Sequence, residues 1–548
     1  MGEHLIVFYR EKLKSTWKLA FWSAVVLGLV VHLYKLTNLL PNHDSLYNFY
    51  SSQNMVASGR WFLSIACGLG SCFDLPWVNG LLSLGFMGIT AALLAEVFRM
   101  KSPVLIVLCS GLLVSFPAIT ATMFYEFTAD GYMLAMVLAA LSVCLTRMEY
   151  IGKRYWYYQV LSAACICLSC GIYQAYVSFA FVMAVCYFMA ELLENKRQEK
   201  LYWKWIGTQV AVYIGGLAAY YLIWKLCLCL QGVEASSYLG INEVGVMGAT
   251  QMVTAAVNVI RFFIRFFLEW NILDYGVTVY SVLNMLFLAV FALGLFAAVR
   301  KSGCLKRKIH ILLLALCLIS LPFGCYVWML ASPGVYYRTI MLQSIVLLYI
   351  FTAVICDRWV CTGGKDLKGN AVLLLLSAIV FNNSVAANIG YIYMDQCYEK
   401  TYATAVEVSS RVHLLDDGTI RYVALVGSLD PWEQEDYFDS SKLRQLGGWK
   451  HMDKTIFTSQ FLYLYTDFDL SYYRINGLEY PLVENEPNIP APHDWQFRYP
   501  VLSAAEQEAL GQTEAVRNMP VWPARDSVQV MGDTVVVKLS ETGEDASD

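Results

Sequence analysis

The sequence predicts a mainly α-helical, polytopic membrane protein that ends in a small α+β domain. Of its 548 residues, 58% are hydrophobic and only 15% are charged, whereas soluble domains carry about 25% charged residues. Its mean hydropathy is +0.50. Apolar runs recur as far as residue 389, and beyond residue 394 charges, Pro and Asn become frequent. We therefore expect a transmembrane domain over 1–393 and an extracytoplasmic domain over 394–548.

The transmembrane domain is predicted to contain eleven spans, since a helix needs roughly 20 apolar residues to cross the hydrocarbon core. No small-residue cleavage site follows the first apolar run, so we expect that run to be a span rather than a signal peptide. Between residues 155 and 193, Gly171 and Gln174 interrupt the apolar run and divide it into two spans. The predicted spans are 18–36, 78–97, 103–123, 128–146, 156–172, 175–193, 205–228, 276–299, 309–330, 340–356 and 371–389.

The distribution of Lys and Arg predicts the orientation of these spans. With the N-terminus inside, 21 Lys and Arg residues fall in the inner segments and six in the outer loops. This bias follows the positive-inside rule. A miscounted span would reverse the bias downstream of the error, and no reversal occurs. The N-terminus is therefore predicted to be cytoplasmic and the C-terminal domain extracytoplasmic.

The C-terminal domain is expected to mix helices with a few strands. The run "TIRYVALVGSL" at 419–429 is rich in β-branched residues and ends at a turn, which is typical of a strand. The run "DTVVVKLS" at 533–540 is a second candidate strand. The last residues, "ETGEDASD", have the composition of a disordered tail.

Neither the cysteines nor the known nucleotide motifs indicate a cofactor. Most of the 16 cysteines lie inside apolar runs, where they are expected to behave as small buried hydrophobic residues. No CxxC pair is matched by a second pair or by clustered His, so the metal-site spacing is missing. Cys67 and Cys72 lie in an outer segment, and a local disulfide between them is left open. There is no P-loop and no GxGxxG after a strand, and no nucleic-acid partner is expected.

Polar side chains gather in the predicted outer loops. The first outer loop, "NHDSLYNFYSSQNMVASGRWF", holds His43, Asp44 and Arg60, and "MFYEFTADGY" holds Glu126 and Asp130. An Arg fork makes two hydrogen bonds to a phosphate, aromatic faces suit sugar rings, and a carboxylate accepts a proton from a hydroxyl. Together these residue types predict a site for a lipid-linked phosphosugar and a hydroxyl acceptor.

Two further outer segments contribute arginines. The short loop 331–339 holds Arg338. In "AAVNVIRFFIRFFLEWNILDYG", Arg261 and Arg265 are four residues apart, so they share one face of a helix whose other positions are largely apolar. This pattern predicts an amphipathic helix that lies in the outer membrane interface.

Structural roles remain open for the same residues. Asp130 and Asp44 each precede or begin a predicted helix and are suited to capping it. Arg60, Arg261 and Arg265 are equally suited to anchoring interfacial segments to lipid headgroups. His43 fits a structural hydrogen bond as well as it fits a base.

Four short motifs, in this order, resemble those of the GT-C class of membrane glycosyltransferases. They are "NHDS" (42–45), "ASGRWF" (57–62), "YEFTADGYMLA" (125–135) and "GIYQAY" (171–176). Within that class the chain is most similar to the glucosyltransferase II family, known from O-antigen modification in bacteria, over about residues 20–390. The resemblance implies a bacterial plasma-membrane protein that moves a sugar, glucose for this family, from a polyprenyl-phosphate donor. The acceptor would be a cell-surface glycan or its lipid-linked precursor on the outer side.

The resemblance also implies roles for particular residues. The acid of the first loop corresponds to Asp44, although relatives often have paired acids there and Ser45 follows Asp44 here. Glu126 or Asp130 would complete the catalytic site. In the mechanism that we expect, Arg338, with Arg60 or Arg261 as alternatives, stabilises the phosphate, and Arg265 is a further expected substrate-binding residue. The remaining expected substrate-binding residues are His43, Tyr47, Trp61, Tyr125 and Gln174.

The expected reaction is a single displacement at the anomeric carbon, in which Asp44 accepts the proton of the attacking hydroxyl. Whether a divalent metal, Mg or Mn, assists the phosphate is left open. The main alternative is a flippase or polymerase of lipid-linked glycans. A transporter often contains internal repeats and charges near the bilayer midplane, and the sequence has neither pattern. An enzyme that acts at the membrane surface is therefore favoured over a transporter.

Overall fold

The computed structural model confirms the predicted helical architecture and describes most of the chain. The described residues are 11–40, 55–70, 75–236, 248–268, 279–332, 335, 337–360, 367–427, 468–469, 499–500 and 502–541. They form two compact units. The first comprises the described residues up to 39 and from 55 to 389, and the second comprises Leu40 and the described residues from 390 onwards.

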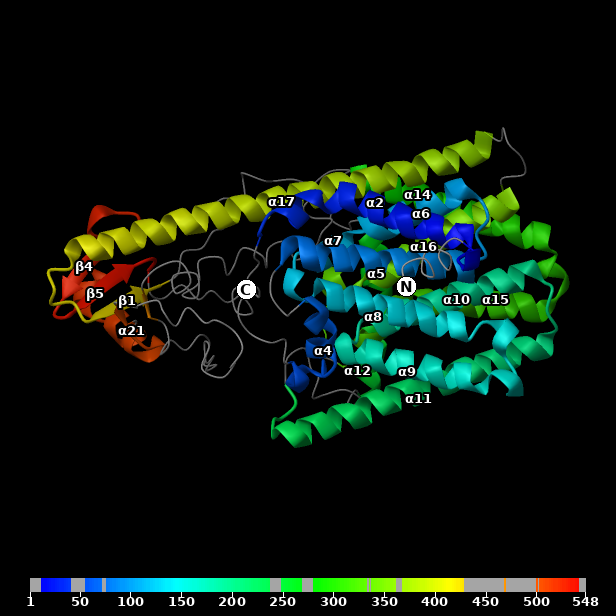
Figure 1. Ribbon diagram of the computed structural model, residues 1–548, viewed down its shortest axis with the longest axis horizontal. Helices are drawn as coiled ribbons and strands as arrows, with labels where there is room; N and C mark the ends of the chain where they lie inside the picture. The colour runs from blue at the N-terminus through cyan, green and yellow to red at the C-terminus, as the bar shows by residue number, and fades with distance from the viewer. Residues whose placement is uncertain are drawn as a thin grey trace. The chain divides into compact units, whose positions relative to one another are not determined.

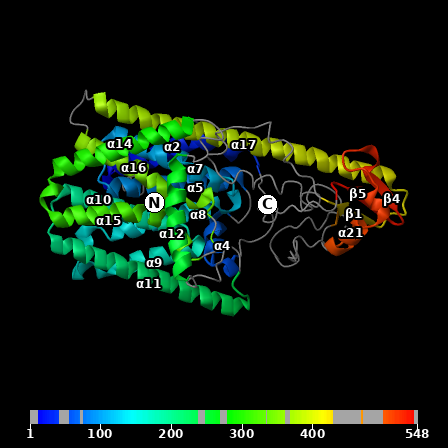
Figure 2. The same cartoon turned by 180° about the vertical axis from the view of Figure 1, so that it is seen from behind.

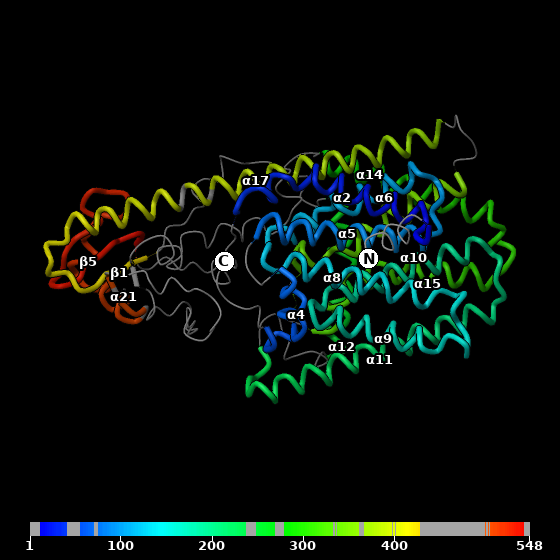
Figure 3. The backbone as a smooth tube through the Cα atoms, viewed as in Figure 1, coloured from blue at the N-terminus to red at the C-terminus, as the bar shows by residue number. Residues whose placement is uncertain are grey.

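The first unit is a bundle of long helices that run side by side (Figure 1). Its helices are α2 (Ser15–Thr37), α4 (Leu63–Cys67), α5 (Pro76–Val97), α6 (Pro103–Ser115), α7 (Pro117–Met123), α8 (Glu126–Leu145), α9 (Trp156–Ile172), α10 (Tyr176–Glu194), α11 (Glu199–Gln231), α12 (Ala249–Leu268), α14 (Val279–Ser302), α15 (Lys308–Cys325), α16 (Val346–Ile355) and the first part of α17 (Leu367–Leu415). The most buried of the long helices is α10, which packs against α8 and α15 (Figure 3).

Eleven of the described helices are long and apolar enough to cross a membrane, and a bent pair brings the total to as many as 12. Ten of the eleven overlap a predicted span. The eleventh is α12, which the sequence assigned to the membrane interface. The bent pair is α6 and α7, which together occupy the predicted span 103–123.

Pro117 explains the bend of 50° between α6 and α7. Proline has no backbone N–H and disfavours a helical conformation in the residue before it, and Phe116 is accordingly extended, with ψ at 139°. Helix α6 begins a short way along the chain after Phe98, whose carbonyl accepts from Arg358. Helix α7 leads into Glu126, which forms an ion pair with Lys35. The bent pair therefore joins the two ends of the bundle. The predicted span is therefore present but bent.

Helix α12 runs across the long helices instead of along them, as Figure 2 shows. The hydroxyl of Tyr280 donates to the carbonyl of Phe266 (3.0 Å), and the hydroxyl of Tyr326 donates to that of Phe262 (3.3 Å). Both contacts dock α12 onto neighbouring segments. Its apolar face is buried at residues such as Phe267, whereas the two arginines are exposed. The predicted amphipathic helix is thus present with its two faces, and its position in the membrane interface stays a prediction.

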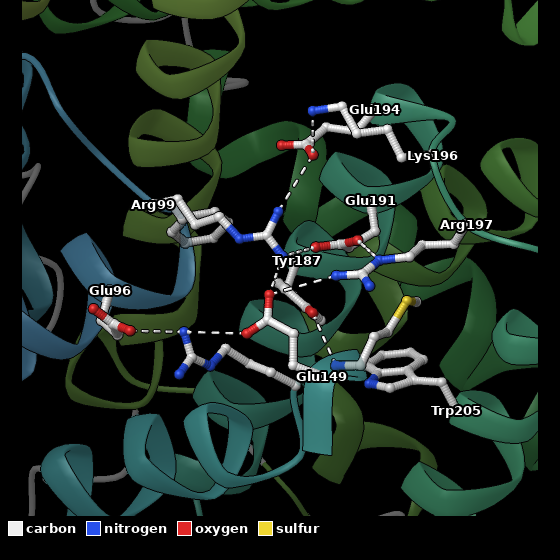
Figure 4. A network of polar contacts seen from close by, with 12 residues as sticks. Glu96, Arg99, Glu149, Tyr187, Glu191, Glu194, Lys196, Arg197 and Trp205 are labelled. Carbon is white, nitrogen blue, oxygen red and sulfur yellow. Dashed lines mark hydrogen bonds and ion pairs between the residues drawn. The ribbon is translucent and has the colours of Figure 1, made fainter. Parts of the chain in front are cut away.

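An ion-pair network joins the segments that were predicted to lie on the inner side (Figure 4). Arg99 contacts Glu149 (2.7 Å), Glu191 (2.6 Å) and Glu194 (3.3 Å), and Arg197 also contacts Glu191 (3.3 Å). Although burial lowers the pKa of Arg99, the carboxylates of Glu191, Glu149 and Glu194 raise it above its ordinary value. We call this end of the bundle the basic end.

Three more cations extend the network at the basic end. Arg147 and Lys14 both contact Glu96, at 2.9 and 2.6 Å, and Arg358 contacts Glu194 at 3.1 Å. The ends of α2, α5, α8 and α10 that were predicted to be inside therefore meet the turn after α16 in one place. This convergence agrees with the predicted alternation of the spans, and the membrane side on which the basic end lies remains a prediction.

Glu191→Gln should lower the stability of the bundle, because Glu191 is 3% exposed and serves two arginines. Removing one partner of a buried ion pair costs about 3–5 kcal/mol. Thermal unfolding of the purified protein in detergent would measure this loss. Lys196→Ala is the matched control, since Lys196 is 75% exposed in its contact with Glu194; an equal loss in both variants would contradict a specific role for the buried pair.

The second unit contains a three-stranded sheet in the order β1-β5-β4, formed by β1 (Tyr422–Val426), β4 (Val528–Met531) and β5 (Thr534–Lys538). β1 is parallel to β5, and β4 is antiparallel to β5. β1 and β5 fall within the two predicted strands. The other described elements are β2 (Phe468–Asp469), β3 (Tyr499–Pro500), α21 (Ala504–Gly511) and α22 (Glu514–Arg517).

Helix α17 continues well beyond the predicted span 371–389. It has 49 residues and ends only at Leu415, so its later turns belong to the second unit. The segment becomes polar after residue 393 but contains no Pro. The change in composition therefore indicated where the membrane span ends and not where the helix ends.

Candidate active site

Arg60 lies at the end of the bundle opposite the basic end, in a turn that packs against α8. Its Nη1 donates to the hydroxyl of Tyr132 (3.2 Å), and its guanidinium carbon lies 4.8 Å from the ring centre of Tyr173. The rings of Tyr132 and Tyr173 stack at 4.7 Å with an angle of 11°. Two tyrosines thus hold the guanidinium plane of a half-buried arginine in one orientation. An arginine held in this way is preorganised to bind a planar or tetrahedral oxyanion.

Gln174 connects this turn to two other segments. Its Nε2 donates to the carbonyl of Ser58 (2.8 Å) and to the hydroxyl of Tyr220 (3.0 Å), while its backbone carbonyl accepts from Nε1 of Trp328 (3.0 Å). Gly59 adopts a φ of +79°, a conformation that glycine tolerates best, which lets the chain turn beside Gln174. The side-chain amide nitrogen of Gln174, expected to bind substrate, therefore holds the Arg60 turn in place.

Arg338 belongs to the segment that Trp328 ties to Gln174. The hydroxyl of Tyr337 accepts from the backbone N–H of Trp328 (3.0 Å), and its ring lies 4.8 Å from that of Tyr326. Burial raises the pKa of Tyr337, so this phenol stays neutral. Arg338 itself is half-buried and precedes a 3-10 turn, Thr339–Met341, that packs on α7. The structure thereby links the Arg60 and Arg338 segments through Gln174.

Asp130 and Glu126 are both buried on the first turns of α8, with exposed fractions of 1% and 5%. Oδ1 of Asp130 accepts from the N–H of Gly131 (2.8 Å), while Oδ2 lies beside Gly70. Glu126 makes an ion pair with Lys35 (2.6 Å). Because α8 begins at Glu126 and not at Asp130, the alternative that Asp130 caps this helix is wrong.

Lys35 and Asn79 complete the surroundings of the two carboxylates. Lys35 is in the last turn of α2, and its side chain is 2% exposed. Nδ2 of Asn79, near the start of α5, donates to the backbone carbonyl of Glu126 (3.3 Å). In the sequence, Lys35 was counted only among the outer-loop charges. Its position at the end of an apolar span was the signal that could have identified it as a site residue.

Trp61 and Tyr125 have mainly packing contacts. A side chain at Gly171 would approach the Trp61 ring to 2.8 Å, so the ring fills the space that glycine leaves on α9. Tyr125 precedes α8 and packs edge-on against Phe127 at 6.4 Å. Both residues are half-buried, and a sugar contact for either remains a prediction.

Several predicted site residues are not brought into this arrangement. Arg261 and Arg265 are exposed on α12, and no hydrogen bond or ion pair joins them to Arg60 or Asp130 in the described part of the chain. His43, Asp44, Tyr47 and Cys72 lie outside the described residues. The role of Asp44 as proton acceptor therefore stays a prediction, and the Cys67–Cys72 disulfide stays open.

No described group of three His, Cys, Asp or Glu side chains is arranged to hold a metal ion. In the site, Glu126 is paired with Lys35, and Asp130 is flanked by Gly131 and Gly70.

Gly70→Ala should disrupt this site, because a Cβ at that position would collide with Asn79 and would lie 2.7 Å from Oδ2 of Asp130. We expect a loss of about 1–3 kcal/mol in stability, the usual range for overpacking, together with reduced activity. Gly68→Ala is the matched control, since Gly68 is two residues away and a Cβ there meets nothing within 4 Å. Thermal unfolding and transfer assays on both variants would test this; equal behaviour would contradict the close approach.

Fold and site together define a multi-pass membrane protein with buried carboxylates and a tyrosine-held arginine at one end of its helix bundle. A family model described as Glucosyl transferase GtrII matches residues 33–356. That range covers more than half of the chain and includes Lys35, Arg60, Asp130 and Arg338, and the chain belongs to this family. The suspected resemblance is confirmed, and the family indicates a glycosyltransferase. No curated protein and no solved structure matches the chain.

Proposed function

We propose that this protein transfers a glucosyl residue from a polyprenyl-phosphate carrier to a cell-surface glycan or its lipid-linked precursor. The reaction takes place at the extracytoplasmic side of the bacterial plasma membrane. Family membership supports glucosyl transfer. The observation that carries the proposal is the grouping of Asp130, Glu126 and Arg60 at the end opposite the basic end. Positive-inside bias makes that end the outer one.

The reaction is a single displacement. The acceptor hydroxyl oxygen attacks the anomeric carbon and forms the new C–O bond, while the bond from that carbon to the phosphate oxygen breaks. The polyprenyl phosphate leaves with the electron pair, and the hydroxyl proton moves to a carboxylate. Atoms and charges balance without a further reactant.

Two carboxylates have complementary roles in this proposal. Asp44, the acid of the first outer loop, accepts the hydroxyl proton. Asp130 supplies a second negative charge, which favours the oxocarbenium-like sugar of the transition state. Its place on the first turns of α8, with Oδ2 beside Gly70, supports this role. Glu126 is less suited to accept a proton, because Lys35 already neutralises it.

Arg60 and Arg338 stabilise the leaving phosphate. The charge on the phosphate grows as the glycosidic bond breaks, and a donor that is already oriented stabilises that charge without rearranging. The stacked tyrosines supply this orientation to Arg60. The polyprenyl tail lies between helices in the hydrocarbon region, and Trp61, Tyr47 and Tyr125 contact the sugar. Arg261 and Arg265 on α12 attract the anionic carrier to the outer interface.

Reconstitution tests the proposal directly. The purified protein in liposomes should move labelled glucose from polyprenyl-phosphate glucose to an extracted cell-surface glycan, and it should leave UDP-glucose unused. Transfer from UDP-glucose alone would overturn the lipid-linked donor. A deletion strain provides a second test, since loss of one side-branch glucose supports transfer, whereas loss of the whole polymer indicates a flippase or polymerase.

A further inference from the structure

Lys35 and Glu126 form a buried ion pair in a region where charges are unfavourable. Their side chains are 2% and 7% exposed, and Nζ lies 2.6 Å from Oε2. Taking two charges out of water costs several kcal/mol each, and replacing such a pair by apolar residues of similar volume is often neutral or stabilising. Stability alone therefore does not explain why the pair is present.

The ion pair lies next to Asp130. Glu126 and Asp130 are four residues apart on α8, which places them on the same face one turn apart. Asn79 contacts the surroundings of both residues. Its Nδ2 donates to the backbone carbonyl of Glu126, and its side chain lies close to Gly70. Gly70 also borders Oδ2 of Asp130. Two carboxylates one helical turn apart in a region poor in water do not both stay ionised unless a cation compensates one of them.

The elements packed around this turn supply few other ionisable groups. Lys35 comes from α2 and Cys67 from α4, whereas α5 and the turn before it present Asn79 and Gly70, which do not titrate. From α10, Tyr176 packs near this part of α8, with its ring 6.5 Å from that of Tyr132. α7 has no ionisable residue, and α9 meets α8 further along, where Ser169 donates to the carbonyl of Ala135. Arg60 also reaches α8, from the turn before α4, where it donates to the hydroxyl of Tyr132, whereas Lys35 is the cation that contacts Glu126.

We propose that Lys35 is a positioning residue of the transferase site: it holds Glu126 as a charged, non-reacting carboxylate, so that Asp130 is ionised at neutral pH. This inference rests on the proposed function. Without Lys35, Glu126 and Asp130 share one proton, and Asp130 carries its full charge only when the pH rises. Lys35 does not touch the reacting atoms and acts through Glu126.

The pH dependence of glucosyl transfer in liposomes tests this role with four proteins. Wild type and Lys35→Arg should lose activity at the same acidic pH. Lys35→Met should need a pH higher by about one unit or more, with about tenfold lower activity at neutral pH and recovery at alkaline pH. The double variant Lys35→Met/Glu126→Gln removes the second carboxylate, so the pH at which it loses activity should return to that of wild type, whatever its maximal rate.

Two results would overturn the inference. One is an unchanged pH profile of glucosyl transfer in Lys35→Met. The other is a loss of activity that is equal at every pH, which is what a purely structural role for the ion pair would produce. Thermal unfolding in detergent shows whether each variant is folded. If Lys35→Met does not fold, the uncharged double variant still tests the proposal. A pH profile of transfer that is displaced from that of wild type contradicts it.

Infrared spectroscopy of the protein with 13C-labelled Asp and Glu provides a readout that needs no substrate. At neutral pH, Lys35→Met should gain a protonated-carboxyl stretching band, which the double variant should lack. If wild type transfers no glucose at any pH, the proposed function fails while this band still tests Lys35. If wild type transfers glucose and the band does not appear, the Lys35 inference alone fails.

Discussion

Asp44→Asn and Asp130→Asn should each reduce glucosyl transfer by about 100-fold or more, the effect expected for losing a general base or a preorganised transition-state charge. Asparagine keeps the shape of aspartate, and at position 130 it can still accept from the N–H of Gly131. It neither takes a proton nor carries a charge. Initial rates in liposomes, with binding of the polyprenyl-phosphate donor measured separately, would show a loss in turnover with little change in affinity.

Glu149→Gln is the control for this pair, because Glu149 is a carboxylate of the basic end and is 38% exposed. It should keep nearly the full rate. If Asp44→Asn turns over like wild type and Asp130→Asn does not, Asp130 is the base. If both variants keep the full rate, neither carboxylate takes part and the mechanism is wrong.

Arg60→Ala should reduce the rate by about 100–1000-fold, as removal of one preorganised donor to a developing oxyanion does in other enzymes. Arg60→Lys should recover little of it, because an ammonium group keeps the charge but loses the planar fork that stacks on Tyr173. Arg338→Ala should cause a loss of similar size. The measurement is the transfer rate at saturating donor.

Arg154→Ala is the matched control, since Arg154 also lies over a tyrosine, Tyr155 at 5.6 Å, but belongs to the segment predicted to be inside. It should leave the rate unchanged. A full rate in Arg60→Ala would instead assign Arg60 to lipid-headgroup anchoring, the alternative that the sequence left open.

Most of the bundle was predictable because membrane spans have a strong local signal. Ten predicted spans correspond to long helices, and α12 is present where amphipathic periodicity indicated it. Two features were not predicted in detail. Pro117 bends one span, and α17 runs on to Leu415 because polarity ends a membrane span without ending a helix.

The candidate site was predictable only in part. Asp130, Glu126 and Arg60 were selected from the sequence by residue type and loop position, and the structure places all three near the same end. Lys35, Asn79, Tyr132 and Tyr173 were missed as members of the site. Lys35 had a signal, its position at the end of an apolar span. Asn79, Tyr132 and Tyr173 lie in or beside apolar runs, where nothing local distinguishes a site residue from an ordinary helix residue.

The sequence by itself determined the class of protein and located ten of the long apolar helices, because the hydrophobic effect acts on each segment separately. The alternation of the spans across the membrane stays a prediction. Only the tertiary structure decided that Lys35 neutralises Glu126, that Gln174 joins the Arg60 and Arg338 segments, and that two tyrosines orient Arg60. These contacts join residues far apart in the chain. Their geometry follows from how the helices pack against one another, which no local pattern of residues specifies.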